Sequence, residues 1–422
     1  MSEERREVFG WVAYDWANSA YVLTVATAVL PAYFAGAVVP PGGVEILGRP
    51  VAASVLWGVA VSLAAVLVFL AAPVLGAVAD HSGAKKRFLA VFCLAGATAA
   101  LGLTACGPGD VALTLALYVA AQVAFNCGNV FYDAFLPQIV PPERYDRVSG
   151  LGYAWGYIGG ALQFVVALVL IVGHDRFGLT QGAASRLGMG LAGLWWAGFA
   201  LVTLRLVHER PGSGQVRLSP LGYLRLGLSS ASVSAREMLR GSPVGLFLAA
   251  FLLYNDGIQT VISMATIYGQ EELKLSMTTL MGTLLVIQLI AFFGAQAFSR
   301  LAERTGTRRA LILALVLWTG VVAYAYTIDS AAEYFALGAL VGVVLGGSQA
   351  LSRSLFAAII PAGQSAQYFG YFSVVTKLSA IGGPLVFAAV RLATGTSRAA
   401  ILAVAVFFLA GMAILTRVRG GR

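Results

Sequence analysis

Charged residues are scarce in this chain, at 11% of its 422 residues, whereas hydrophobic residues make up 59%. Soluble domains carry roughly 25% charged residues, so this chain cannot cover its surface with polar groups in water. Cysteine and histidine are also rare, with three of each and no CxxC spacing. We therefore expect Cys93, Cys106 and Cys127 to be small core residues, and we expect no metal site, no disulfide and no cofactor.

Several functional motifs are missing from the sequence. There is no GxxxxGK[ST] loop, so ATP is not expected to drive the protein directly. There is also no HExxH, no GxSxG and no Ser/His pair within the apolar segments, which argues against an intramembrane enzyme. No cleavable signal is recognisable, because charged residues precede a first apolar segment that carries polar residues of its own. We predict that the chain is not an enzyme.

Long apolar runs are abundant instead, and each is near the roughly 20 residues that cross a bilayer. They cover residues 9–34, 52–79, 88–106, 111–136, 149–173, 187–207, 244–268, 278–299, 310–327, 332–358, 366–390 and 399–416. With both termini on one side, 20 of the 28 Lys and Arg lie on that side, six lie on the other, and two lie inside spans. This bias predicts cytoplasmic termini and explains the net charge of +9 without nucleic acid.

A loop motif between the second and third runs recurs in altered form between the eighth and ninth. The first copy contains Gly76, Asp80, Gly83, Lys85 and Lys86, and the second contains Glu303, Gly306, Arg308 and Arg309. Such a repeat at half the chain length predicts two homologous six-helix bundles around a shared pathway, at residues 1–207 and 244–422. We expect Asp80 to lie at the positive end of a neighbouring helix, and both loops to govern switching.

Residues 208–243 are expected to link the two bundles on the cytoplasmic side. Leucines alternate with Arg225, Arg236 and Arg240 in this stretch. Two interpretations remain open, an interfacial amphipathic helix and a flexible basic tether.

Ionisable residues inside membrane spans are expensive, so each invites a functional explanation. In the first span, Asp15 and Asn18 share a face with Ser19 and follow Tyr14. The seventh span carries a second polar cluster, consisting of Tyr254, Asn255, Asp256 and Gln259, and Gly257 there favours a loosened helix. These clusters predict a central site in which Asp15 carries a proton or binds an ammonium group. The alternative is a buried structural cluster.

The fourth and tenth spans carry matching stripes. Gln122, Asn126, Asn129 and Asp133 lie on one helical face, and a shift of 220 residues aligns them with Gly342, Gly346, Gln349 and Arg353. Asp133 and Arg353 therefore occupy equivalent positions with opposite charges. We predict that they meet across the pathway as an inner gate; the alternative is that each pairs within its own bundle.

Lys377 lies inside the eleventh span, before Gly382-Gly383-Pro384. It is a candidate to bind a substrate carboxylate or to neutralise Asp256 or Asp15, and the sequence does not choose between these.

The loop from Gly76 to Arg87 resembles the signature of the major facilitator superfamily. Within it, the chain resembles the vacuole-effluxer (autophagy-related) family through Tyr14-Asp-Trp-Ala-Asn-Ser-Ala-Tyr21, Phe131-Tyr-Asp-Ala-Phe-Leu-Pro137, Tyr254-Asn-Asp-Gly257 and Gly346-Gly-Ser-Gln-Ala-Leu-Ser-Arg353. The resemblance implies an all-α membrane protein of twelve helices and suggests amino-acid transport. Short loops and 24 Arg against four Lys favour a bacterial member in the cytoplasmic membrane.

We therefore expect a monomeric secondary transporter of small polar solutes, most of all amino acids, that works by alternating access with protons as a candidate coupling ion. Two alternatives are an efflux pump for drugs or metabolites and a membrane receptor or scaffold that has lost transport. The polar and charged residues on the lining helices favour the transporter of polar solutes.

Overall fold

The computed structural model describes residues 2–46, 48–210 and 218–418 and is almost entirely helical. Twelve helices in this described part are long and apolar enough to cross a membrane. The first runs from Glu3 to Val38 and the last from Ser397 to Leu415. The predicted all-α fold with twelve membrane-spanning helices is confirmed.

Six spans precede the linker. They are formed by α1 (Glu3–Ala20) with η1 (Tyr21–Val29), α2 (Leu30–Tyr33) and η2 (Phe34–Val38), by α3 (Ala53–Ser82), by α4 (Lys85–Gly102) with η3 (Leu103–Ala105), by α5 (Val111–Asp133) with α6 (Leu136–Ile139), by η4 (Pro142–Arg144) with α7 (Tyr145–Val172), and by α8 (Gln181–Leu206). A short antiparallel hairpin of β1 (Val44–Ile46) and β2 (Arg49–Val51) connects the first two spans. The turn η5 (His174–Phe177) precedes α8.

Six spans follow the linker helix α9 (Pro220–Leu239). They are α10 (Pro243–Glu271), α11 (Met277–Thr305), α12 (Thr307–Thr327), α13 (Ala331–Ile359), the pair α14 (Ser365–Leu378) and α15 (Gly382–Thr394), and the pair α16 (Ser397–Ala403) and α17 (Ala405–Leu415).

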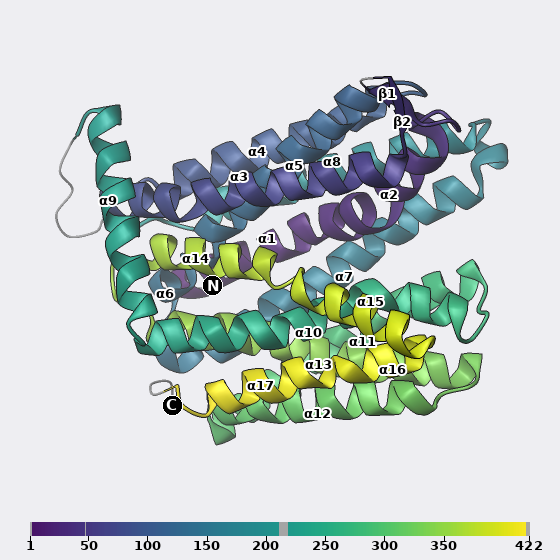
Figure 1. The fold of residues 1–422 in the computed structure, drawn as a ribbon. Coiled ribbons are helices and arrows are strands. Elements are labelled where there is room, and N and C mark those ends of the chain that lie inside the picture. Colours follow the sequence, from purple (N-terminus) through teal and green to yellow (C-terminus); the bar gives the residue numbers. More distant parts are fainter. Residues whose placement is uncertain (1, 47, 211–217, 419–422) are drawn as a thin grey trace.

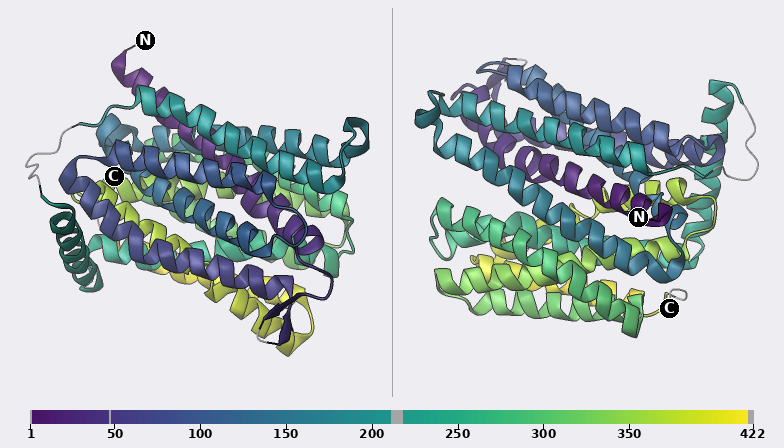
Figure 2. Two further views of the ribbon diagram at one scale, coloured as in Figure 1. Left: turned by 90° about the horizontal axis from the view of Figure 1, so that it is seen from above. Right: turned by 180° about the vertical axis from the view of Figure 1, so that it is seen from behind.

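The two halves of the chain lie side by side, with the helices of the first half in one layer and most of the second in another (Figure 2). Both termini and α9 lie at one end of the spans, which we call the terminal side (Figure 1). The β1–β2 hairpin lies at the other end, which we call the hairpin side. Residues 211–217 of the predicted linker lie outside the described residues.

The first and eleventh spans contain departures from regular α-helix. The first contains π-helical turns from Tyr21 to Val29, close to Pro31, which has no backbone N–H to donate. The eleventh is interrupted between Leu378 and Gly382. The expectation that Gly257 loosens the seventh span is wrong, because α10 continues through it and the site of a Cβ on Gly257 is 2.9 Å from the Phe408 ring.

Candidate functional site

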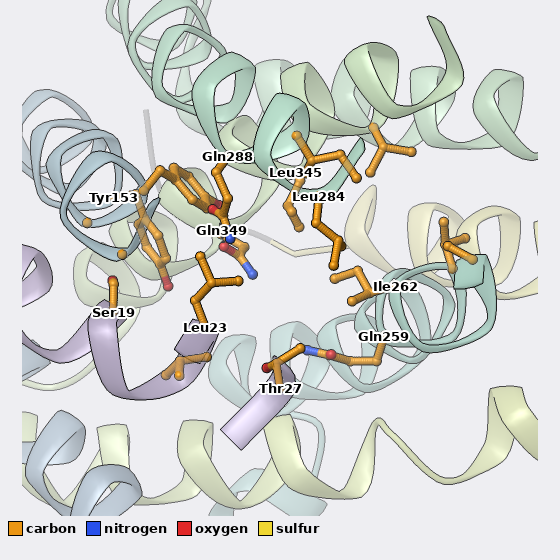
Figure 3. A pocket seen from close by; sticks show the side chains of 18 of the residues that line it. Ser19, Leu23, Thr27, Tyr153, Gln259, Ile262, Leu284, Gln288, Leu345 and Gln349 are labelled. Carbon is orange, nitrogen blue, oxygen red and sulfur yellow. Dashed lines mark hydrogen bonds between the residues drawn. The ribbon is translucent and has the colours of Figure 1, made fainter. Parts of the chain in front are cut away.

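A cavity of about 400 Å³ lies between the two halves. It is lined by residues of the first span, α5, α7, α10, α11, α12, α13 and α16. Figure 3 shows Ser19, Leu23 and Thr27 of the first span facing Ile262 of α10 and Leu284 of α11 around this space. Its volume falls in the range of small-molecule sites, which is roughly 300–1,000 Å³.

Arg353 of α13 forms the charged floor of the cavity on the terminal side. Its Nη1 lies 3.0 Å from Asp15 Oδ2 and 3.1 Å from Asp133 Oδ1, so both carboxylates share one nitrogen. Arg353 is only 2% exposed, and it joins the second half of the chain to two helices of the first. The predicted position of Asp133 opposite Arg353 thus corresponds to a contact in the structure, and Asp15 is a further partner.

Ser149 of α7 holds the same guanidinium from another direction. Arg353 donates through Nε to Ser149 Oγ at 3.0 Å and through Nη2 to the Ser149 carbonyl at 2.9 Å. The guanidinium carbon also lies 4.6 Å from the centre of the Trp11 ring and 4.2 Å from that of Tyr153. These contacts fix the orientation of the arginine and supply cation–π attraction.

Gly152 of α7 leaves room for this cluster because glycine has no side chain. A Cβ on Gly152 of α7 would lie 2.5 Å from Asp15 Oδ2 and 2.8 Å from Arg353 Nη2. Glycine at this position therefore lets the backbone of α7 approach the charged groups directly.

Amide and hydroxyl groups surround the charged floor. Asn18 donates to Asn129 Oδ1 at 2.7 Å, and Tyr157 donates to Gln349 Oε1 across the two halves. Together with Gln259, the predicted residues Asp15, Asn18, Asn129 and Gln349 all line the cavity.

The wall toward the hairpin side is mainly apolar. It includes Val22, Leu23, Val261, Ile262, Leu284, Ile287, Val321, Val322, Leu337, Val341 and Leu345. The cavity thus combines a charged and polar floor with a hydrocarbon wall.

The predicted site residues Tyr14, Asn126, Tyr254 and Asn255 are not among the lining residues and have partners within their own halves. The Tyr14 ring packs 4.7 Å from that of Tyr132. Asn126 donates to the Gln122 carbonyl, Tyr254 pairs with Ser352 Oγ at 2.7 Å, and Asn255 donates to Ser379 Oγ. Tyr14, Tyr254 and Asn255 thus join neighbouring segments of their own halves, whereas the Asn126 hydrogen bond stays within α5. A structural role of this kind is the alternative that the sequence had left open for the polar clusters.

Asp256 is not a lining residue of this cavity either. Its Oδ1 accepts a hydrogen bond from the backbone N–H of Gly383 at 2.8 Å, at the start of α15. The carboxylate therefore serves as a cap, supplied by a neighbouring helix, for the second part of the interrupted span.

Lys377 lies at the last turn of α14, just before the interruption, and is partly buried. Among the described residues, no carboxylate lies within ion-pair distance of its Nζ, so it neutralises neither Asp15 nor Asp256 here. It does not line the central cavity.

The first copy of the repeated loop joins the two halves on the terminal side. Asp80 is paired with Lys85 at 2.7 Å and accepts backbone N–H groups from Ala366 at 3.2 Å and Gln367 at 2.8 Å. It thus sits at the N-terminus of α14, where the helix dipole favours a carboxylate. Gly76 leaves room beside it, because a Cβ there would lie 2.8 Å from Gln367 Cα.

The remaining residues of this copy shape the loop itself. Gly83 ends α3 with a positive φ of 62°, which glycine adopts without strain. The backbone N–H groups of Lys85 and Lys86 begin α4 and donate to Glu209 of the linker at 2.7 and 3.1 Å.

The second copy is built differently. Glu303 and Arg309 are exposed, Gly306 has a φ of 93°, and Arg308 donates to the Val418 carbonyl at 2.7 Å. Here the link between halves comes from Asp146 of α7, which accepts hydrogen bonds from Thr307 Oγ1 at 2.8 Å and from Ser354 Oγ.

Sequence reasoning missed Ser149, Tyr153, Tyr157 and Gln288 as parts of the site. Tyr153 and Tyr157 directly follow Gly152 and Gly156, and Ser149 lies one turn before Tyr153, so the regular spacing of these glycines was a usable signal. Glycines that bring α7 against the first span also bring their neighbours to the cavity.

Comparisons of the sequence with a family model and with known proteins point to the same family. The family described as vacuole effluxer Atg22 like matches residues 3–422. An uncharacterized MFS-type transporter of Bacillus subtilis (strain 168), YxiO, is 31% identical over 421 residues, covering 98% of this chain and 95% of that protein. Autophagy-related protein 22-1 of Aspergillus fumigatus is 28% identical over 301 residues, or 65% of this chain and 49% of that protein. The chain thus aligns with about half the length of this fungal relative.

Solved structures share the fold. The human organic anion transporter MFSD10 (TETRAN) superposes with a TM-score of 0.75 at 17% identity, over 98% of this chain and 100% of that one. FucP in its outward conformation superposes with a TM-score of 0.73 at 12% identity, over 99% and 100%. The protein is an MFS-type multi-pass membrane transporter, and the chain belongs to the Atg22-like vacuole-effluxer family of the major facilitator superfamily.

Proposed function

We propose that this protein transports amino acids, with apolar side chains preferred, by alternating access, and that a proton exchanges with the substrate ammonium group at Asp15. The observation that carries the proposal is the sharing of one guanidinium nitrogen by two carboxylates at the floor of the cavity.

The formal charges of this cluster do not cancel. Asp15 and Asp133 contribute two negative charges and Arg353 contributes one positive charge, which leaves a single negative charge. In a poorly hydrated site an uncompensated charge is costly, so the cluster favours one additional cation. An ammonium group and a proton both satisfy it, and their competition for one site couples their movements.

The rest of the cavity suits the remainder of such a substrate. Asn18, Asn129 and Gln349 offer amide groups to a carboxylate beside the bound ammonium group. Leu23, Ile262 and the other apolar wall residues then surround an aliphatic side chain. Burying such a side chain supplies roughly 1.5–3 kcal/mol.

The arrangement of contacts fits one state of an alternating-access cycle. Asp80, Asp146 and the Arg353 cluster join the halves on the terminal side. The cavity extends from this cluster to Tyr268 and Tyr334, near the hairpin-side ends of α10 and α13. We assign the structure to a state that is closed on the terminal side.

The same proposal includes the orientation. The excess of Lys and Arg on the terminal side favours a cytoplasmic location for that side. We propose that the membrane is the cytoplasmic membrane of a bacterial cell, with the hairpin side outside. The state described here is then outward-facing, and the proposed working unit is a monomer.

The test is counterflow of labelled leucine and a panel of amino acids in proteoliposomes, with wild type, Asp15→Asn and Asp256→Asn compared. We expect saturable exchange in the wild type and its loss in Asp15→Asn. Asp256→Asn is the matched control, because its carboxyl lies outside the cavity and asparagine still offers an acceptor to Gly383.

Two results would contradict the proposal. Absence of counterflow for every amino acid would remove the substrate class, and exchange of apolar cations that lack a carboxylate would then favour a drug or metabolite pump. Unchanged leucine exchange in Asp15→Asn would remove Asp15 from the mechanism.

A further inference from the structure

The linker helix α9 packs against the sides of two spans that belong to different halves. A Cβ on Gly227 would lie 2.9 Å from the carbonyl oxygen of Val74 in α3. On α14, Gln367 donates to Ser234 Oγ at 2.8 Å and accepts from Ser230 Oγ at 2.9 Å. The helix therefore bridges α3 and α14, and it runs across the ends of the spans rather than along them (Figure 1).

The level of these contacts relative to the end of α3 suits a position of α9 in the membrane interface. Val74 and Val78 of α3, which both face Gly227, precede the end of that helix at Ser82 by eight and four residues. At 1.5 Å per residue, the contact lies roughly 6–12 Å inward from the end of α3. This depth corresponds to the headgroup and upper acyl region that interfacial helices occupy.

One flank of α9 is a stripe of exposed leucines. Leu221, Leu224, Leu228 and Leu239 are 56%, 46%, 53% and 87% exposed. Their spacings of 3, 7 and 18 residues from Leu221 put them on one side of the helix. No other helix among the described residues covers this stripe.

The other flank of α9 meets polar surroundings. Tyr223 lines a cavity together with Lys86, Arg87 and Glu209, at the loop between α3 and α4. With that flank beside charged groups, the leucine stripe is the side of α9 that is suited to face the hydrocarbon of the bilayer.

Three arginines accompany the leucines. Arg225 and Arg236 are exposed and eleven residues apart, so they lie on one face beside the stripe, and Arg240 is exposed just after the helix. Glu237 is the one acidic residue between positions 218 and 242. A row of guanidinium groups at headgroup level matches the phosphates of anionic phospholipids.

We propose that α9 is an interfacial helix that binds anionic phospholipid, with its leucines among the acyl chains and its arginines on the headgroup phosphates. Because α9 also contacts α3 and α14, the lipid is held beside the seam at which the two halves meet on the terminal side. This lipid surface is separate from the central cavity and does not depend on which substrate the cavity takes.

The first experiment measures depth. Spin labels are placed at Leu228→Cys on the stripe and at Val233→Cys on the other flank, in proteoliposomes of phosphatidylcholine with and without phosphatidylglycerol. Val233 is a fair comparison, because it is 50% exposed and Leu228 is 53% exposed. We expect the label at position 228 to be accessible to oxygen dissolved in the membrane, and the label at 233 to be accessible to a water-soluble relaxation agent. Equal aqueous accessibility at both positions would overturn the proposal.

The second experiment measures lipid retention by native mass spectrometry of the detergent-purified protein titrated with phosphatidylglycerol or phosphatidylcholine. The triple variant Arg225→Gln/Arg236→Gln/Arg240→Gln should retain phosphatidylglycerol about tenfold less than wild type, with phosphatidylcholine unchanged. Arg300→Gln/Arg304→Gln, which removes two exposed arginines of α11, is the control and should behave as wild type. Equal retention in the triple variant and wild type would show that these arginines do not bind the lipid.

Discussion

At the scale of single residues, the main feature is a buried arginine that forms ion pairs with two carboxylates. Arg353 Nη1 is within 3.1 Å of both Asp15 and Asp133, and the arginine is only 2% exposed. Removing the arginine leaves two carboxylates near each other without a cation. Removing Asp133 alone leaves Arg353 paired with Asp15. We therefore expect the two substitutions to differ in their effect on stability, although both remove the contact between Asp133 and Arg353.

We predict that Arg353→Gln destabilises the closed terminal side by about 3–5 kcal/mol, the range for breaking a buried ion pair, and that Asp133→Asn has a smaller effect. Distances between spin labels on the terminal ends of α5 and α13 report the fraction of closed molecules, and thermal unfolding in detergent reports stability. Arg300→Gln, on the exposed surface of α11, is the control. If the closed fraction is the same in all three variants as in wild type, the cluster is no gate.

The sequence predicted part of this cluster for a clear reason. The repeat aligns Asp133 with Arg353, and in the structure these two residues of the related halves are in contact. Asp15 and Ser149 also contact Arg353, because the first span and α7 are each rotated about their own helix axis so that these side chains face the arginine. That rotation depends on how close the backbones approach at Gly152, and no pattern within one helix records it.

At the scale of elements, the interrupted eleventh span is the clearest departure from a regular bundle. The segment α14 ends at Leu378, and α15 begins at Gly382 with its Gly383 N–H bonded to Asp256 of α10. A helix start inside a membrane needs such an acceptor, because lipid offers none to a free N–H group.

We predict that Asp256→Ala lowers the stability of the protein by about 1–2 kcal/mol, since it leaves the first turn of α15 without its acceptor. The Asp256→Asn variant should lose much less stability, because the side-chain oxygen of asparagine can still accept a hydrogen bond from the Gly383 N–H. Thermal unfolding of both variants in the same detergent measures the difference. Equal losses in both variants would mean that the charge of Asp256 matters rather than its hydrogen bond.

A signal for this interruption is present in the sequence, but no interruption of the eleventh span was predicted from it. Pro384 cannot donate a hydrogen bond to the carbonyl of Ala380, and Gly382 and Gly383 precede it. Gly257 was expected to loosen the seventh span instead. A single glycine between good packing partners does not open a helix, whereas a proline after two glycines removes a hydrogen bond outright.

At the scale of the whole molecule, close contacts on the terminal side hold the two halves together. Gly76 of α3 meets the backbone of Ala366 and Gln367 at the start of α14, and Gly150 of α7 meets Ser299 of α11. Such contacts between small residues let helices approach closely where they are surrounded by lipid.

We predict that Gly76→Leu opens the terminal side, because no space exists for a side chain against Gln367. A Ser19→Cys reporter in the cavity is labelled with an impermeant maleimide from either side of proteoliposomes of known orientation. Labelling from the terminal side should increase several-fold in Gly76→Leu. Gly198→Leu is the control, since nothing lies within 4 Å of a Cβ at that position.

An unchanged pattern of labelling in Gly76→Leu would show that the α3–α14 contact is not needed for closure. The native cysteines at positions 93, 106 and 127 are buried and should contribute little background.

The overall architecture was readable from the sequence because lipid imposes a simple length rule on apolar runs, and because the repeat divides the chain in two. The asymmetry between the halves was not readable. Asp80 reaches across to α14, but its counterpart Glu303 is exposed and Asp146 makes the corresponding link. Equivalent positions in the two repeated loops therefore have different roles, because each loop packs against a different helix.

The unequal number of acids and bases at the cavity floor also has an electrical consequence. An amino acid at neutral pH is a zwitterion with no net charge, whereas a proton carries one. Under the proposed exchange at Asp15, each cycle moves one net charge across the bilayer. The membrane potential then contributes about 2.3 kcal/mol per cycle for every 100 mV, in addition to the pH gradient. Two carboxylates on one guanidinium would thus make the protein sensitive to voltage without any charged segment that moves through the membrane.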